Sequence, residues 1–123
     1  MYTTSDNVIG CAIKVHRRLG PGLLESVYEE CLSYELTKAG IFFERQKPMP
    51  VVYDHIYLDA GYKIDLFVNH DLVVELKSVV SLQPVHLAQT LTYLRLAECR
   101  YGLIINFNVA LLNQGVKRVV NGY

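Results

Sequence analysis

The chain has 123 residues, of which 51% are hydrophobic and 20% charged, so one domain can bury a core without disulfide or metal cross-links. Twelve Lys and Arg residues balance twelve Asp and Glu residues, which excludes an overall positive field that could hold a long polyanion, so any nucleic-acid binding must be local. No leader peptide, membrane-length apolar run or cysteine framework is visible, and we therefore expect a soluble cytoplasmic protein folded as a single domain over residues 1–123.

Two helices are expected at the start of the chain. Several N-cap candidates precede apolar residues at helical spacing, which predicts a first helix over about residues 5–19. Gly20-Pro21-Gly22 interrupts it, because Pro21 disfavours a helical conformation in the preceding residue. A second helix follows and ends at Gly40. Its expected apolar stripe consists of Leu24, Tyr28, Leu32 and Leu36.

Strand-forming residues begin at Ile41. The runs 41–46 and 51–53 are rich in β-branched and aromatic residues, but Pro48 and Pro50 cannot donate to a ladder, so this strand is interrupted or lies at a sheet edge. Two alternating runs follow, 62–68 and 72–77, separated by a polar three-residue segment. They are predicted to form an antiparallel hairpin.

The remaining elements complete an α/β pattern. Pro84 fits the first turn of a third helix that continues to about Cys99, with Leu87, Leu91 and Leu94 facing inward. The apolar run 103–105 is typical of a strand in the middle of a sheet, and a last strand is expected over 116–120.

The candidate chemistry lies on the central hairpin. In each of its strands apolar residues alternate with charged ones, so each strand has one apolar face and one mixed face. Keeping the apolar faces together fixes the register, because a slip of one residue would bury charge, and this register places Asp65 opposite Glu75. The expected apolar pairs are Ile64 with Leu76, Leu66 with Val74 and Val68 with Leu72.

Opposed side chains of this kind have Cβ atoms about 4.5–5.5 Å apart, close enough for two carboxylates to share one cation. Oxygen ligands favour Mg²⁺ or Mn²⁺ over zinc. Lys77 emerges on the same face and completes an acid, acid, lysine cluster that can polarise a phosphodiester. The alternative is a purely structural salt bridge on a wet sheet face, Glu75 with Lys63 or Asp65 with Lys77.

Polar residues on two helices extend this cluster. Gln89 and Tyr93 are one turn apart and share a face with His86. This polar face is either a solvent-facing stripe or part of the site, and for His86 alone the solvent-facing stripe or a structural hydrogen bond is favoured. Glu25 and Glu29 share a face near the start of the second helix, where the helix dipole alone is a sufficient explanation of Glu29.

Taken together, these residues resemble the GxxExxY proteins, small prokaryotic proteins of the PD-(D/E)XK nuclease superfamily. The resemblance covers nearly the whole chain. Its segments are Gly22-Leu23-Leu24-Glu25-Ser26-Val27-Tyr28, Phe43-Glu44-Arg45-Gln46-Lys47, Gly61-Tyr62-Lys63-Ile64-Asp65-Leu66, Val74-Glu75-Leu76-Lys77-Ser78, Ala88-Gln89 and Gly102-Leu103-Ile104-Ile105-Asn106-Phe107.

The resemblance implies a restriction-endonuclease-like αβββαβ core, with a mixed central sheet flanked by helices and a metal site built from Asp65, Glu75 and Lys77. Gln89 and Tyr93 look like the Gln-x-x-x-Tyr element of the RecB-like branch, and Glu25 looks like the helix acid that completes metal coordination there. The proline of the superfamily's name is replaced by Ile64.

The leading hypothesis is a Mg²⁺-dependent nuclease, with Mn²⁺ as the alternative ion and DNA as the favoured nucleic acid. Asp65, Glu75 and the Leu76 carbonyl would hold the metal, with Glu25 joining directly or through water. A non-catalytic binding or assembly protein with the nuclease fold is the main rival, because a small neutral chain offers little surface for a duplex. The third hypothesis is an α/β protein without a functional site here, in which the charged residues of the hairpin lie on the surface and have no role. A homodimer is possible, and apolar residues such as Tyr53, Tyr57, Leu111 and Leu112 could supply its interface.

Overall fold

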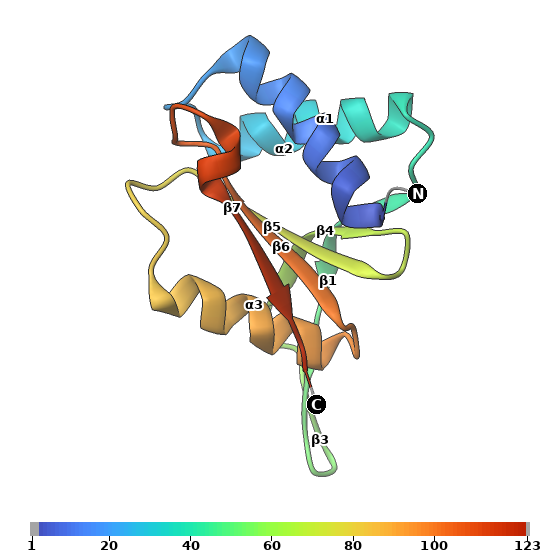
Figure 1. Ribbon diagram of the computed structural model, residues 1–123. Coiled ribbons are helices and arrows are strands. Elements are labelled where there is room, and N and C mark those ends of the chain that lie inside the picture. Colours follow the sequence, from blue (N-terminus) through green and yellow to red (C-terminus); the bar gives the residue numbers. More distant parts are fainter. Residues whose placement is uncertain (1–2, 123) are drawn as a thin grey trace.

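A computed structural model describes residues 3–122. A mixed five-stranded sheet lies between two helical layers, with α1 and α2 on one face and α3 on the other (Figure 1). This confirms the expected fold class, a mixed sheet flanked by helices. The elements are α1 (Thr4–Leu19), α2 (Glu25–Lys38), β1 (Phe43–Pro48), β2 (Val51–Tyr53), β3 (Ile56–Leu58), β4 (Lys63–Val68), β5 (Leu72–Lys77), α3 (Pro84–Leu96), β6 (Tyr101–Asn106), a 3-10 helix η1 (Leu112–Gly115) and β7 (Val116–Val120).

The sheet order is β1-β4-β5-β6-β7. β5 and β6 are parallel because α3 carries the chain back across the sheet between them, and the other neighbouring strands are antiparallel. β1, which ends at Pro48, lies at one edge, as its prolines predict.

The register of the central hairpin is the expected one. Leu66 pairs with Val74 and Val68 with Leu72, so the paired segment ends one residue before Asp65 and Glu75. The two acids therefore lie at the point where β4 and β5 stop forming a regular ladder.

Two apolar clusters cover the two faces of the sheet. Leu66, Val74 and Leu76 join α1 and α2 on one face. Phe67 and Val73 join Tyr93 and Leu94 of α3 on the other. Ile64 belongs to the α3 cluster, so the expectation that it shares a face with Leu66 and Leu76 is wrong. The regular alternation of β4 is broken between Ile64 and Leu66, around Asp65.

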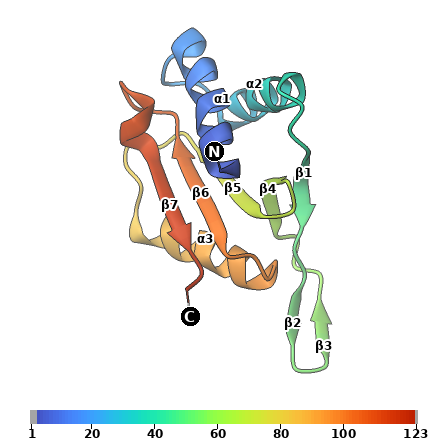
Figure 2. The same ribbon diagram turned by 45° about the vertical axis from the view of Figure 1, so that its right-hand side comes forward.

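Other boundaries also differ from the expectation. A short strand, β3, pairs with β2 to form a hairpin that projects away from the main sheet (Figure 2). Leu24 precedes α2 as its N-cap and is 73% exposed, so it is not part of the apolar stripe. α3 ends at Leu96, and its Leu87 is 37% exposed while Thr90 is buried in its place. Within residues 3–122 no helix has the length and apolar character needed to cross a bilayer.

Candidate functional site

Two carboxylates continue the contact between β4 and β5 where the ladder ends. The backbone N–H of Asp65 donates to Oε2 of Glu75 over 2.9 Å, and the backbone N–H of Leu76 donates to Oδ2 of Asp65 over 2.8 Å. Each acid thus accepts a hydrogen bond from the opposite strand. The side chains take the place of backbone carbonyls, and this exchange fixes both acids in the seam between the strands.

This pair is short of positive charge. Glu75 is only 4% exposed, and its burial together with the neighbouring Asp65 raises its pKa to about 8. Burial also raises the pKa of Asp65. Lys77 lies near enough to favour both ionised forms, but its effect is smaller than that of burial. Ionisation of both carboxyl groups at once is therefore unfavourable in the metal-free protein.

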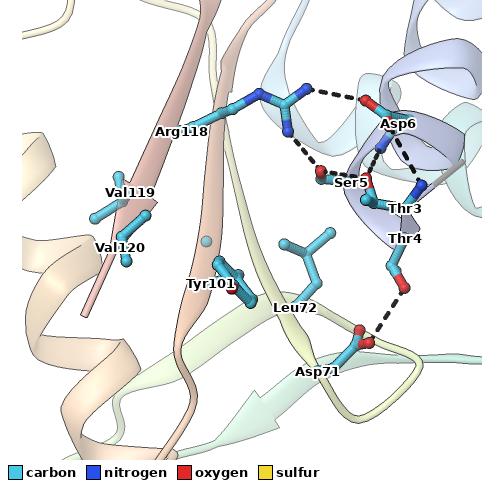
Figure 3. A pocket seen from close by; sticks show the side chains of 11 residues that line it. Thr3, Thr4, Ser5, Asp6, Asp71, Leu72, Tyr101, Arg118, Val119 and Val120 are labelled. Atoms are coloured by element: carbon cyan, nitrogen blue, oxygen red, sulfur yellow. Dashed lines mark hydrogen bonds and ion pairs between the residues drawn. The ribbon is translucent and has the colours of Figure 1, made fainter. Parts of the chain in front are cut away.

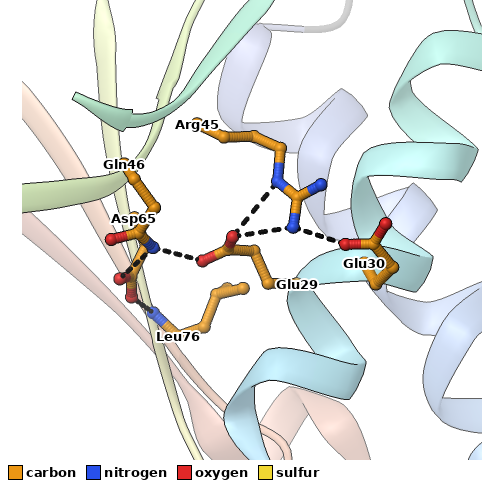
Figure 4. Close-up of polar contacts among 6 residues, drawn as sticks. All are labelled: Glu29, Glu30, Arg45, Gln46, Asp65 and Leu76. Carbon is orange, nitrogen blue, oxygen red and sulfur yellow. Dashed lines mark hydrogen bonds and ion pairs between the residues drawn. The ribbon is translucent and has the colours of Figure 1, made fainter.

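Glu29 is the part of the site that the sequence interpretation missed. It is 8% exposed and accepts hydrogen bonds from Nε and Nη2 of Arg45, over 3.1 and 3.0 Å, and from Nε2 of Gln46 over 2.6 Å (Figure 4). Helix dipole complementarity is therefore not a sufficient account of Glu29. The sequence did carry an indication, because Glu29 repeats with Leu32 and Leu36 at helical spacing and so lies on the buried stripe of α2.

Gln46 joins this network to the acid pair. Its Nε2 also donates to Oδ1 of Asp65 over 3.2 Å, so one amide group lies between the carboxylates of Glu29 and Asp65 (Figure 4). The backbone of Gln46 has φ of 50°, in the left-handed region that non-glycine residues seldom adopt. Strain of this kind persists when surrounding contacts impose it, and the two hydrogen bonds to carboxylates are such contacts.

Glu25 lies at the start of α2 because Tyr28 shapes the preceding loop. The Tyr28 ring stacks on Phe107, and its hydroxyl donates to the Gly20 carbonyl and accepts from the Leu23 backbone N–H. These contacts explain the spacing of glycine, acid and tyrosine in this segment, since Tyr28, about one helical turn after Glu25, holds the loop from which the helix begins.

The Glu25 carboxylate is itself engaged. Its Oε2 accepts the backbone N–H of Ser78 over 3.0 Å, and its charge contributes to the raised pKa of Glu75. Across residues 3–122 no three His, Cys, Asp or Glu side chains gather closely enough to hold a metal ion together. The structure thus brings Asp65 and Glu75 into contact and leaves Glu25 at the border of the pair.

Tyr93 reaches the acids from α3. It is 6% exposed, so the alternative of a solvent-facing stripe does not hold for this residue. Its pKa is raised by burial and then by the charges of Glu75 and Asp65, which places the phenol beside the pair. Nε2 of Gln89 donates to the Tyr93 hydroxyl over 3.4 Å. Of the two alternatives for His86, the structure shows the hydrogen bond, since its Nδ1 accepts the backbone N–H of Gln83.

The donor set suits a hard divalent cation. Mg²⁺ is commonly bound in proteins through one or two carboxylates, with water and substrate oxygens completing its shell. Asp65 and Glu75 supply two such carboxylates, and burial together with the neighbouring Asp65 raises the pKa of Glu75, so a bound cation would favour the ionised pair. The residues present therefore fit Mg²⁺ or Mn²⁺ without a third carboxylate in place.

A separate cavity of about 680 Å³ contains none of these residues. It lies where the first turn of α1 meets the beginnings of β5 and β6 and the end of β7 (Figure 3). Its cation, Arg118, is already bonded to Ser5 and Asp6, and the Asp71 carboxylate accepts from Thr4. The charged groups of this cavity are therefore used to attach α1 to the sheet.

One protein-family model matches the chain, the PD-(D/E)XK nuclease superfamily, over residues 2–119. Searches of curated proteins and of solved structures found no match.

Removing the Glu29 carboxylate should destabilise the fold far more than removing its neighbour. Glu29→Ala leaves Arg45 and Gln46 without their buried acceptor, and we expect the free energy of unfolding to fall by about 2 kcal/mol, since Arg45 is partly exposed. Glu30→Ala removes an exposed partner of the same arginine and should change stability very little. Urea unfolding of both variants provides the measurement, and equal effects would contradict the assignment.

The acid pair also predicts a pH dependence of the metal-free protein. Because the pKa of Glu75 is raised in the folded state to about 8 from 4.5, the folded state binds a proton that the unfolded state releases. The contribution of Glu75 to stability should therefore be greatest below pH 4.5 and fall as the pH rises towards 8, by at most about 1.4 kcal/mol per pH unit. Urea unfolding in EDTA at several pH values should show this slope in the wild type and lose it in Glu75→Gln.

Proposed function

The chain belongs to the PD-(D/E)XK nuclease superfamily, and on that premise we propose that it is a Mg²⁺- or Mn²⁺-dependent nuclease that hydrolyses phosphodiester bonds of nucleic acid, with DNA as the preferred substrate. The single observation that carries the proposal is the pair formed by the buried Glu75 and the partly buried Asp65, which accept hydrogen bonds across the seam of β4 and β5 with Lys77 beside them. A buried pair of like charges is costly to keep unless a cation neutralises it.

The cation would be held by Asp65, Glu75 and the backbone carbonyl of Leu76. Glu25 would join through a water molecule, or directly after releasing the Ser78 N–H. When bound, the ion would supply Lewis-acid polarisation of the phosphodiester and activation of the attacking water. Gln46, itself held by Glu29, would keep the Asp65 carboxylate in its orientation.

The remaining residues act on the phosphate and the water. Lys77 is partly exposed at the end of β5, so its ammonium group would orient the nucleophilic water and offset charge in the transition state. Gln89 and Tyr93 form a linked pair on α3 beside the acids and would position the lysine or the scissile phosphate.

We also assign the chain to the GxxExxY proteins of the RecB-like branch. The support is the segment from Gly22 to Tyr28, whose tyrosine fixes the loop that leads to Glu25. A cytoplasmic location, action as a single domain and a homodimer remain part of this proposal. The exposed apolar side chains of the β2–β3 hairpin, Tyr53 and Tyr57 among them, support an interface with a second copy or another protein. Leu112 cannot contribute as expected, because it is 5% exposed and packs in the core.

Neutralising either acid should abolish cleavage. With single-stranded, duplex and branched DNA and with RNA, each tested with Mg²⁺ and with Mn²⁺, we expect Asp65→Asn and Glu75→Gln to lower the rate at least about a hundredfold. Circular dichroism should show the fold retained. Asp59→Asn, a matched change at an exposed aspartate, should leave the rate unchanged. A wild-type protein inactive on all these substrates would refute the nuclease assignment.

A non-catalytic protein with this fold is the second candidate. The observation that favours it is the pKa of Glu75, because a protonated Glu75 beside Asp65 satisfies the pair with no metal at all.

Calorimetric titration with Mg²⁺ and Mn²⁺ separates the two candidates. A nuclease should bind the ions and gain thermal stability, by about 2.7 kcal/mol at a hundredfold excess over Kd, and the double variant Asp65→Asn/Glu75→Gln should lose both effects. No heat of binding and no shift in Tm would favour the non-catalytic protein.

A further inference from the structure

A second pocket adjoins the acid pair on its α3 side. Its volume is about 530 Å³, within the range of small-molecule sites, and it lies between α3 and the residues that flank the β2–β3 hairpin. Tyr93 is common to both regions, because it lines the pocket and packs in one apolar cluster with Ile64, the residue next to Asp65. A ligand in this pocket would therefore be next to the proposed catalytic residues.

The wall of this pocket is aromatic and apolar. Tyr62 contributes a ring that is 47% exposed, and its centroid lies 6.4 Å from that of Tyr93 with the two planes at 60°. Val85, 66% exposed, forms part of the same wall. A half-exposed tyrosine ring beside a second ring offers a stacking surface for a flat, conjugated group.

Two polar groups accompany the rings. Nδ1 of His86 accepts a backbone hydrogen bond, so the neutral ring carries its proton on Nε2 and can donate there. The amide nitrogen of Gln89 is directed to Tyr93, which leaves the Gln89 carbonyl oxygen as an acceptor. One donor and one acceptor beside an aromatic slot match the edge of a nucleobase, which presents both kinds of group.

The absence of charge among the pocket's described residues favours an unpaired base over duplex nucleic acid. None of the described residues that line the pocket is Asp, Glu, Lys or Arg, so the pocket neither repels a phosphate strand nor grips one. The whole chain is neutral, with twelve basic and twelve acidic residues. Binding would therefore depend on stacking, which requires a base that is free of its partner.

We propose that this pocket receives an unpaired nucleobase of the strand whose phosphodiester lies at Asp65 and Glu75, so that the substrate is single-stranded or locally unpaired nucleic acid. This inference rests on the proposed nuclease function. The base stacks on Tyr62, with His86 and Gln89 at its edge, and the adjoining phosphate reaches the acids past Tyr93.

The test measures binding without cleavage. Fluorescence anisotropy in EDTA compares labelled single strands of about 12 nucleotides, one of DNA and one of RNA with the same sequence, with the corresponding duplex DNA. The wild type should bind single strands at least about tenfold more tightly than the duplex. Tyr62→Ala should lose about tenfold in affinity for the single strand. Tyr34→Ala, which removes a tyrosine 63% exposed on α2, is the matched control and should change nothing.

A charge variant tests the same pocket without removing a core contact. Val85→Asp places a carboxylate in the first turn of α3, where the helix dipole favours it, so the fold should be kept while phosphate is repelled. Val85→Asp should weaken single-strand binding, and more so at low salt. Val85→Asn, whose side chain has the same shape as that of Asp but no charge, should weaken binding less.

The outcomes separate this inference from the proposed function. Cleavage that depends on Asp65 and Glu75, together with equal affinity for single strand and duplex or with full binding by Tyr62→Ala, would overturn the pocket assignment and leave the nuclease standing. Single-strand binding that Tyr62→Ala removes, in a protein that cleaves nothing, would support the pocket and refute the nuclease. A change of oligomeric state in Tyr62→Ala, with oligonucleotide affinity unaltered, would assign the pocket to a protein partner instead.

Discussion

The arrangement around the candidate site depends on two carboxyl groups held together in a largely buried seam between β4 and β5. Asp65 and Glu75 come from neighbouring strands whose register is fixed by apolar pairs such as Leu66 with Val74, so neither acid can move away without shifting the sheet. Hydrogen-bond donors and one cationic group surround the two carboxyl groups. The N–H groups of Asp65 and Leu76, the Gln46 amide and the ammonium group of Lys77 are all directed at the pair or lie near it.

The same constraint links elements that are far apart in sequence. Glu29 of α2 is bonded to Arg45 and Gln46 of the edge strand β1, and Gln46 in turn reaches Asp65 of β4. An edge strand has only one neighbour to hold it, and here a buried carboxylate from a helix provides a second attachment. The position of the acid pair is thus tied to the packing of α2 on the sheet.

Much of this arrangement could be predicted from the sequence, because the period-two pattern of the central hairpin permits only one register that keeps charge out of the core. The prediction that this register places Asp65 beside Glu75 is confirmed by the hydrogen bond from the Asp65 N–H to the Glu75 carboxylate. The irregularities could not be predicted in the same way. Ile64 joins the α3 cluster because the strand departs from regular alternation at Asp65, and Gln46 takes a left-handed conformation because two carboxylates from other elements hold its amide. Both effects are imposed by tertiary contacts, whereas strand periodicity describes only local geometry.

The β2–β3 hairpin has a further consequence for how such a protein can diversify. β1 and β4 pair up to Pro48 and Lys63, so the chain leaves the sheet and returns to it at adjacent points. Changing the length of a segment whose ends are already held together costs little entropy, because closure depends only weakly on length. Insertions or replacements in this arm would leave the strand register and the acids untouched, so selectivity could evolve separately from the chemistry.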